Sequence, residues 1–133
     1  MLKVEHIGIA VNDIDQSKAL FSKLFNSEPY KEEVVETEQV KTSFFKIGDT
    51  KIELLEAIEE SSPINIFIQK KGEGVHHIAY EVEDLEKEME RLRREGFQLL
   101  SEKPKKGADN KIICFLHPKS TNGVLIELCQ EIK

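Results

Sequence analysis

Two histidines and two glutamates recur at matching places in the two halves of this chain of 133 residues. His6 and His77 lie 71 residues apart, at the start of the similar runs HIGIAV and HIAYEV. Glu53 and Glu127 each occupy the middle of an Ile-Glu-Leu triplet near the end of one half. Imidazole nitrogens together with carboxylate oxygens suit zinc, cobalt, nickel, manganese or iron(II). The pattern therefore predicts one divalent metal ion with the ligands His6, Glu53, His77 and Glu127.

The alternation of strand residues supports this prediction. In the first strand the branched apolar side chains share one face, and His6 lies on the other with small neighbours. The same parity separates His77, Glu53 and Glu127 from the apolar residues beside them. A buried carboxylate costs several kcal/mol unless it is paired or metal-bound, so the four side chains need a common partner. A lone strand histidine is more often a core residue than a ligand. His76 points to the opposite face from His77, and we expect it to be a strand-start residue.

The repeat extends to the elements that position these side chains. Each half is predicted to be a strand, a helix and then two or three further strands. Asp13 and Asp84, again 71 residues apart, are expected to cap the two helices. The expected strands are 4–11, 40–47, 51–56, 77–82, 97–101, 112–117 and 124–130. The prediction is one α+β domain, 1–133, with module one at about 1–70 and module two at about 74–133.

Composition limits the classes of function. The net charge is −6, which argues against nucleic acid as a partner, because phosphate binding requires a basic surface. No apolar run reaches the length of a membrane span, and no secretory signal is visible. Cys114 and Cys129 both lie in apolar runs, so we expect buried free thiols and a cytoplasmic location.

The quoted runs resemble the vicinal oxygen chelate superfamily of glyoxalases, bleomycin resistance proteins and dioxygenases. Within it, the chain is most similar to the methylmalonyl-CoA epimerase family. The matching motifs are HIGIAV, IELLE, GVHHIAYEV and HPKSTNGVLIEL. The resemblance implies two βαβββ modules that pair into an open, cleft-forming sheet, usually in a homodimer. It also implies the four ligands named above and favours cobalt, with zinc, nickel, manganese and iron as the other candidates.

The implied reaction is inversion at C2 of methylmalonyl-CoA through a metal-stabilised enolate. Such a reaction needs a base on one face of C2 and an acid on the other. The resemblance makes Glu127 one proton carrier as well as a ligand. Some relatives have a glutamate where our alignment places Ser43, and serine is a poor base at neutral pH. A water held by Ser43, a metal-bound water or the nearby Glu38 are the alternatives for the second carrier.

Contacts to the acyl-CoA substrate are expected at two places. His117, Lys119 and Ser120 lie in a turn before the Glu127 strand, where they meet the substrate or simply form a hairpin turn. The second place is the basic patch of an otherwise acidic protein, which meets the coenzyme A phosphates or is a solvated loop. Its members are Lys103, Lys105, Lys106 and Lys111.

Three other functions remain open from the sequence. A glyoxalase I-like lactoylglutathione lyase uses similar ligands with a glutathione-bearing substrate. An iron(II) dioxygenase uses two histidines and one glutamate but usually has a longer chain. A non-catalytic protein of the same fold would bind a small molecule without turning it over.

Overall fold

A computed structural model describes all residues, 1–133, as eight strands, three α-helices and two short 3₁₀ helices. The predicted α+β class is confirmed. The chain divides into two compact units, which are described in turn. The first unit is His6–His76, and the second combines Met1–Glu5 with His77–Lys133. No helix is both long and apolar enough to cross a membrane.

The first unit contains a half-sheet with the strand order β2-β3-β4-β1. Strand β1 runs parallel to β4, whereas β3 is antiparallel to both β4 and β2. The elements are β1 (Lys3–Ala10, of which the unit holds the part from His6), α1 (Ile14–Phe25), β2 (Lys31–Val35), η1 (Glu36–Glu38), β3 (Val40–Ile47), β4 (Thr50–Ala57) and α2 (Pro63–Lys71).

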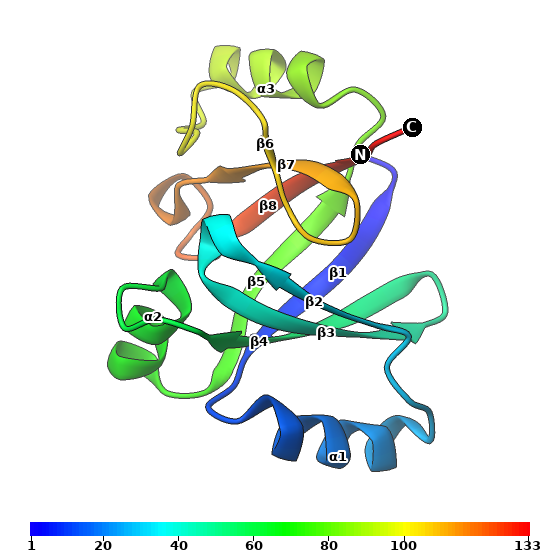
Figure 1. Ribbon diagram of the computed structural model, residues 1–133. Helices are drawn as coiled ribbons and strands as arrows, with labels where there is room; N and C mark the ends of the chain where they lie inside the picture. Colours follow the sequence, from blue (N-terminus) through cyan, green and yellow to red (C-terminus); the bar gives the residue numbers. More distant parts are fainter. The chain divides into compact units, whose positions relative to one another are not determined.

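Helix α1 covers one face of this half-sheet, alongside β3 and β4 (Figure 1). The Asp13 side chain caps the helix, as predicted, by accepting hydrogen bonds from the backbone N–H groups of Asp15 and Gln16. Beneath α1 lies an apolar core, which leaves the opposite face of the half-sheet for His6 and Glu53. The buried residues of this core are Val11, Ile14, Phe45 and Leu54.

The second unit repeats the plan with the strand order β5-β8-β7-β6. Its elements are β5 (Gly74–Glu81, here from His77), α3 (Leu85–Arg94), β6 (Lys105–Lys106), β7 (Lys111–Leu116), η2 (Pro118–Ser120) and β8 (Ile126–Glu131). Strand β5 runs parallel to β8, and β7 is antiparallel to β8 and β6. Asp84 caps α3, as predicted, by accepting from the Lys87 N–H.

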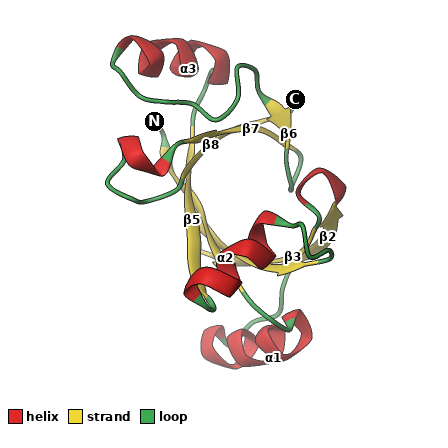
Figure 2. Cartoon of the chain, turned by 90° about the vertical axis from the view of Figure 1, so that its left-hand side faces the viewer, coloured by secondary structure: helices red, strands yellow, loops and turns green.

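Helix α3 lies beside β7 and β8 (Figure 2). It packs Leu85, Met89 and Leu92 against Cys114 and Leu128. Helix α3 thus covers one face of its half-sheet, as α1 does in the first unit. The two cysteines are free and buried, as expected from the sequence.

Three elements differ from the sequence prediction. Strand β2 was not predicted, because KEEVV carries three charged residues and lacks apolar alternation. Residues 97–101 do not form the predicted strand; only an isolated bridge joins Leu99 to Leu116. Strand β6 pairs with β7 instead and lies within the basic segment, for which the sequence predicts no strand.

Candidate metal and active site

The first unit brings His6 and Glu53 into contact. Gly8 pairs with Glu53 in the parallel register of β1 and β4, so His6, two residues before Gly8, lies on the same face as Glu53. His6 Nε2 lies 3.3 Å from Glu53 Oε1. The side chains come from adjacent strands and point away from α1.

The second unit holds an equivalent pair. Ala79 pairs with Glu127, which places His77 and Glu127 on one face of β5 and β8. His77 Nε2 lies 3.3 Å from Glu127 Oε1, the same separation as in the first unit. The duplicated sequence therefore builds the same local arrangement of imidazole and carboxylate twice.

Burial and spacing make each pair suitable for binding a metal ion. The four residues are only 4–6% exposed, although two of them are carboxylic acids. Metal bonds of about 2.0–2.2 Å to nitrogen and oxygen, at angles between about 90° and 109°, separate two ligand atoms by about 3 to 3.5 Å. Each His–Glu distance falls in that range, so the donor set fits a divalent cation.

One aromatic ring packs against His77. The Phe115 ring lies edge-on to the imidazole, with ring centroids 5.9 Å apart. Phe115 pairs with Glu127 in the register of β7 and β8, so it shares the face of the His77–Glu127 pair. The Lys105 ammonium lies 5.7 Å from the Phe115 ring centroid, so a positively charged side chain contacts the same aromatic ring.

His76 has a different environment from its neighbour His77. Strand alternation turns it to the other face of β5, where its ring meets Phe67 edge-on at 5.0 Å between centroids. Phe67 belongs to α2. His76 is therefore part of a packing contact between α2 and the start of β5.

Ser43 lies on the other side of the first half-sheet from Glu53. In the antiparallel register of β3 and β4, Ser43 pairs with Leu54, and Phe44 pairs with Glu53. Leu54 belongs to the core under α1, so Ser43 faces the helix. Its hydroxyl is buried without a hydrogen-bond partner. The register, which the sequence alone does not reveal, does not favour Ser43 as a proton carrier at Glu53.

Glu33 of β2 lies on the opposite face of the half-sheet from Ser43. Glu33 pairs with Thr42, and Thr42 lies on the Phe44 side of β3, so Glu33 shares the face of Glu53. Glu33 also lies 3.6 Å from Lys31 on the same face. The two further glutamates of this segment, Glu36 and Glu38, follow in η1. Because the sequence did not predict strand β2, it indicated only Glu38, beside the predicted strand 40–47, and not Glu33.

The turn that carries His117, Lys119 and Ser120 is the 3₁₀ helix η2. His117 Nδ1 accepts a hydrogen bond from the Lys119 N–H, and the Ser120 hydroxyl donates to the His117 carbonyl at 2.9 Å. These bonds give His117 and Ser120 a role in shaping the turn. Lys119 is exposed.

Lys111 does not belong to the basic surface patch. It is 3% exposed, and its ammonium donates to the Asp109 carbonyl at 3.3 Å. Carboxylates of Asp109 and Glu131 lie 3.9 and 4.0 Å away. Burial among these acceptors removes Lys111 from the groups available to a phosphate.

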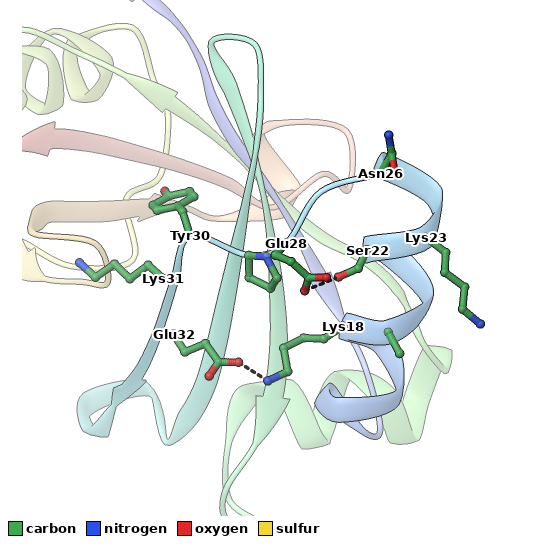
Figure 3. Close-up of a pocket in the computed structure, with 10 residues that line it drawn as sticks. Lys18, Ser22, Lys23, Asn26, Glu28, Tyr30, Lys31 and Glu32 are labelled. Carbon is green, nitrogen blue, oxygen red and sulfur yellow. Dashed lines mark hydrogen bonds and ion pairs between the residues drawn. The ribbon is translucent and has the colours of Figure 1, made fainter.

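A separate groove lies between α1 and β2 in the first unit (Figure 3). Its lysine Lys18 forms ion pairs with Asp15 and Glu32. Ser22 donates a hydrogen bond to Glu28 at 3.3 Å across the same groove. Lys18, Glu28 and Glu32 are therefore engaged with partners within this unit.

Comparisons with known proteins extend over nearly the whole chain. Residues 5–115 match the model of the glyoxalase/bleomycin resistance protein/dioxygenase superfamily. The chain is 39% identical over 130 residues to the ethylmalonyl-CoA/methylmalonyl-CoA epimerase of Cereibacter sphaeroides, covering 96% of this chain and 97% of the relative. It is 38% identical over 130 residues to the uncharacterized protein YqjC of Bacillus subtilis, with coverages of 98% and 93%.

A solved structure is also similar over nearly the whole chain. A variant of Streptomyces coelicolor methylmalonyl-CoA epimerase, in complex with 2-nitronate-propionyl-CoA, is similar with a TM-score of 0.96. The sequences are 34% identical, and the match covers 98% of this chain and 95% of the other. The α+β fold anticipated from the sequence is thus that of a known epimerase.

Proposed function

Because this chain belongs to the glyoxalase/bleomycin resistance protein/dioxygenase superfamily, we propose that it is an epimerase that inverts C2 of methylmalonyl-CoA. The observation that carries the proposal is the duplicated His–Glu pair, buried in each unit with the same 3.3 Å separation. Relatives of similar length that carry the name of this activity support the choice of substrate. For that reason we prefer an isomerase function over that of a glutathione-dependent lyase.

One divalent cation, held by His6, Glu53, His77 and Glu127, belongs to this proposal. Two imidazoles and two carboxylates match the preferences of cobalt, our first choice, and also of zinc, nickel, manganese and iron. The cation compensates for the burial of two carboxylates, which is otherwise unfavourable. When bound, it supplies a Lewis acid that stabilises negative charge on the thioester and carboxylate oxygens of the substrate.

Glu127 is the proposed proton carrier on one face of C2. The C2 proton is weakly acidic because it lies α to a thioester carbonyl. Glu127 takes this proton with a carboxylate oxygen, and the electron pair of the C–H bond delocalises into the thioester as an enolate. Return of a proton to the opposite face inverts C2. A nitronate ligand has the planarity and charge of such an enolate, in line with the complex formed by the Streptomyces coelicolor relative.

The second proton carrier is proposed to be a carboxylate of the segment Glu33–Glu38. Glu33 of this segment lies on the face of the first half-sheet that carries Glu53, and Glu36 and Glu38 follow it in the chain, whereas Ser43 lies beneath α1. A carboxylate is also a far better base than a serine hydroxyl at neutral pH. The three candidates are Glu33, Glu36 and Glu38, and single glutamine variants of each distinguish them.

Further parts of the proposal concern substrate contacts and assembly. The η2 turn, with His117, Lys119 and Ser120, is proposed to contact the substrate, and the exposed Lys119 ammonium supplies its charge. A homodimer is proposed because Leu20 and Leu24 of α1 are 62% and 68% exposed. Two buried free thiols suit a reducing compartment, so we propose the cytoplasm.

Proton exchange at C2 tests the function. The cobalt-loaded protein is incubated with methylmalonyl-CoA in deuterium oxide, and loss of the C2 proton signal is followed by NMR. Ethylmalonyl-CoA serves as a second substrate, because one relative is named for both. The expected result is metal-dependent deuterium incorporation into at least methylmalonyl-CoA. Absence of exchange with fully loaded protein overturns the epimerase proposal, and turnover of the hemithioacetal of glutathione would identify a lyase instead.

A further inference from the structure

The basic segment of the second unit presents its lysines on two different faces. Lys105 and Lys106 form β6 and pair with Ile113 and Ile112 of β7. Ile112 packs against the core under α3, and Ile113 packs with Ala79 on the other face. Paired residues of antiparallel strands share a face. Lys105 is therefore on the His77–Glu127 face, and Lys106 is on the helix side.

Side-chain contacts extend this assignment toward the metal ligands. The Lys105 ammonium lies 5.7 Å from the Phe115 centroid, and the Phe115 ring lies 5.9 Å from that of His77. Glu127 is the register partner of Phe115. One aromatic ring thus separates the Lys105 ammonium from the His77 imidazole, all within a single compact unit.

The backbone around Lys105 is held on both sides. The Arg93 guanidinium donates to the Glu102 carbonyl at 2.7 Å, and the Gly107 N–H donates to the Lys111 carbonyl at 2.9 Å. A Cβ at position 107 would lie 2.8 Å from Ile113 Cδ1, so a larger residue there would require the Ile113 side chain to shift. A residue anchored in this way loses less conformational entropy when it binds a ligand.

We propose that Lys105 is the member of the basic segment that contacts an anionic group of the acyl-CoA substrate. The proposal deepens the epimerase function and rests on it for the identity of the ligand. Two anionic groups share the required chemistry: the free carboxylate at the acyl end and the phosphates of coenzyme A. Lys106 has the same charge one residue away but the opposite face, so it provides a matched control.

Binding measurements separate the two sources. Dissociation constants of methylmalonyl-CoA and of the methylmalonyl-pantetheine thioester, which lacks the nucleotide phosphates, are measured calorimetrically for the cobalt-loaded protein. The variants are Lys105→Gln, Lys105→Arg and Lys106→Gln. Lys105→Gln is expected to weaken binding of methylmalonyl-CoA about tenfold, as for loss of one charge-assisted contact. Lys105→Arg should restore most of the affinity, and Lys106→Gln should change it less than about twofold.

The outcomes are distinct. Weakened binding of both ligands assigns Lys105 to the carboxylate, and weakened binding of the CoA ester alone assigns it to a phosphate. Equal affinities for Lys105→Gln and the wild type overturn the inference, even if the variant melts at a lower temperature, since a cation–π contact to Phe115 accounts for that effect alone. Wild-type protein that binds the CoA ester without C2 exchange contradicts the function but still tests Lys105. Wild-type protein that binds neither ester overturns both proposals.

Discussion

His6 Nε2 lies 3.3 Å from Glu53 Oε1, and the two residues come from adjacent parallel strands. The relationship is repeated by His77 and Glu127 in the other unit. In both cases a strand that follows the helix returns parallel to the first strand of the unit, which brings the end of the module beside its beginning. This connection explains how residues 47 or 50 positions apart in sequence become neighbours in space.

Replacement of His77 by alanine is expected to lower metal content and activity together. Loss of a residue that only supports a ligand typically costs about 10- to 100-fold in metal affinity or activity, so loss of a ligand should cost at least about 100-fold. Metal content is measured by elemental analysis and activity by C2 exchange. His76→Ala is the matched control, because it changes the adjacent imidazole on the other face. Equal losses in both variants would point to misfolding of β5 rather than to a ligand.

Glu127→Gln is expected to abolish proton transfer while preserving the volume of the side chain. A positioned general base contributes about 10²- to 10⁴-fold, so C2 exchange should slow by at least about 100-fold. Rates are compared at saturating cobalt, so that weaker metal binding is compensated. Glu131→Gln, on the same strand but exposed, should retain wild-type activity. Full exchange activity in Glu127→Gln would exclude Glu127 as the proton carrier.

Ser43→Ala is expected to raise the free energy of unfolding by about 1 kcal/mol, because a buried hydroxyl without a partner is removed. The adjacent Thr42→Val should lower it by about 1 kcal/mol, because the Thr42 hydroxyl donates to the Glu33 carbonyl at 3.2 Å. Urea unfolding measures both changes. If Ser43→Ala instead removes C2 exchange and leaves stability unchanged, the serine serves the reaction after all.

The two cysteines are expected to be unreactive toward thiol reagents in the folded protein. Burial raises the pKa of the Cys114 thiol to about 11. Burial, assisted by the Glu127 carboxylate, also raises the pKa of Cys129. Unfolded thiols ionise near pH 8.5, so the unfolded chain releases protons that the folded chain retains. The free energy of unfolding should therefore fall as pH rises from about 8.5 toward 11.

The alkaline effect is isolated by a variant in which both cysteines are replaced by alanine. Unfolding of this variant and of the wild type is followed in urea between pH 7.5 and 10.5. The wild type should lose stability more steeply with pH than the variant, whatever the difference at neutral pH. Identical slopes, or rapid thiol modification of folded protein at pH 8, would show that the thiols are not protected by burial.

Much of the site was predictable because it depends on local rules. Strand alternation was enough to place His6 opposite the isoleucines of β1. Asp13 and Asp84 correctly predicted where the two helices begin. The faces of Ser43 and Lys105 were not predictable, because they depend on the register of β3 with β4 and of β6 with β7. The strand β2 was missed because its charged residues line a sheet edge, where burial does not impose an apolar pattern.

The stoichiometry of cobalt binding tests the central claim most directly, since one cation shared by two His–Glu pairs differs from one cation per pair. Calorimetric titration of metal-free protein with cobalt(II) is predicted to give one ion per chain. His6→Ala and His77→Ala should each abolish that single tight event, although their residues belong to different units. Two ions per chain, or one ion that remains tightly bound in either variant, would contradict the shared site.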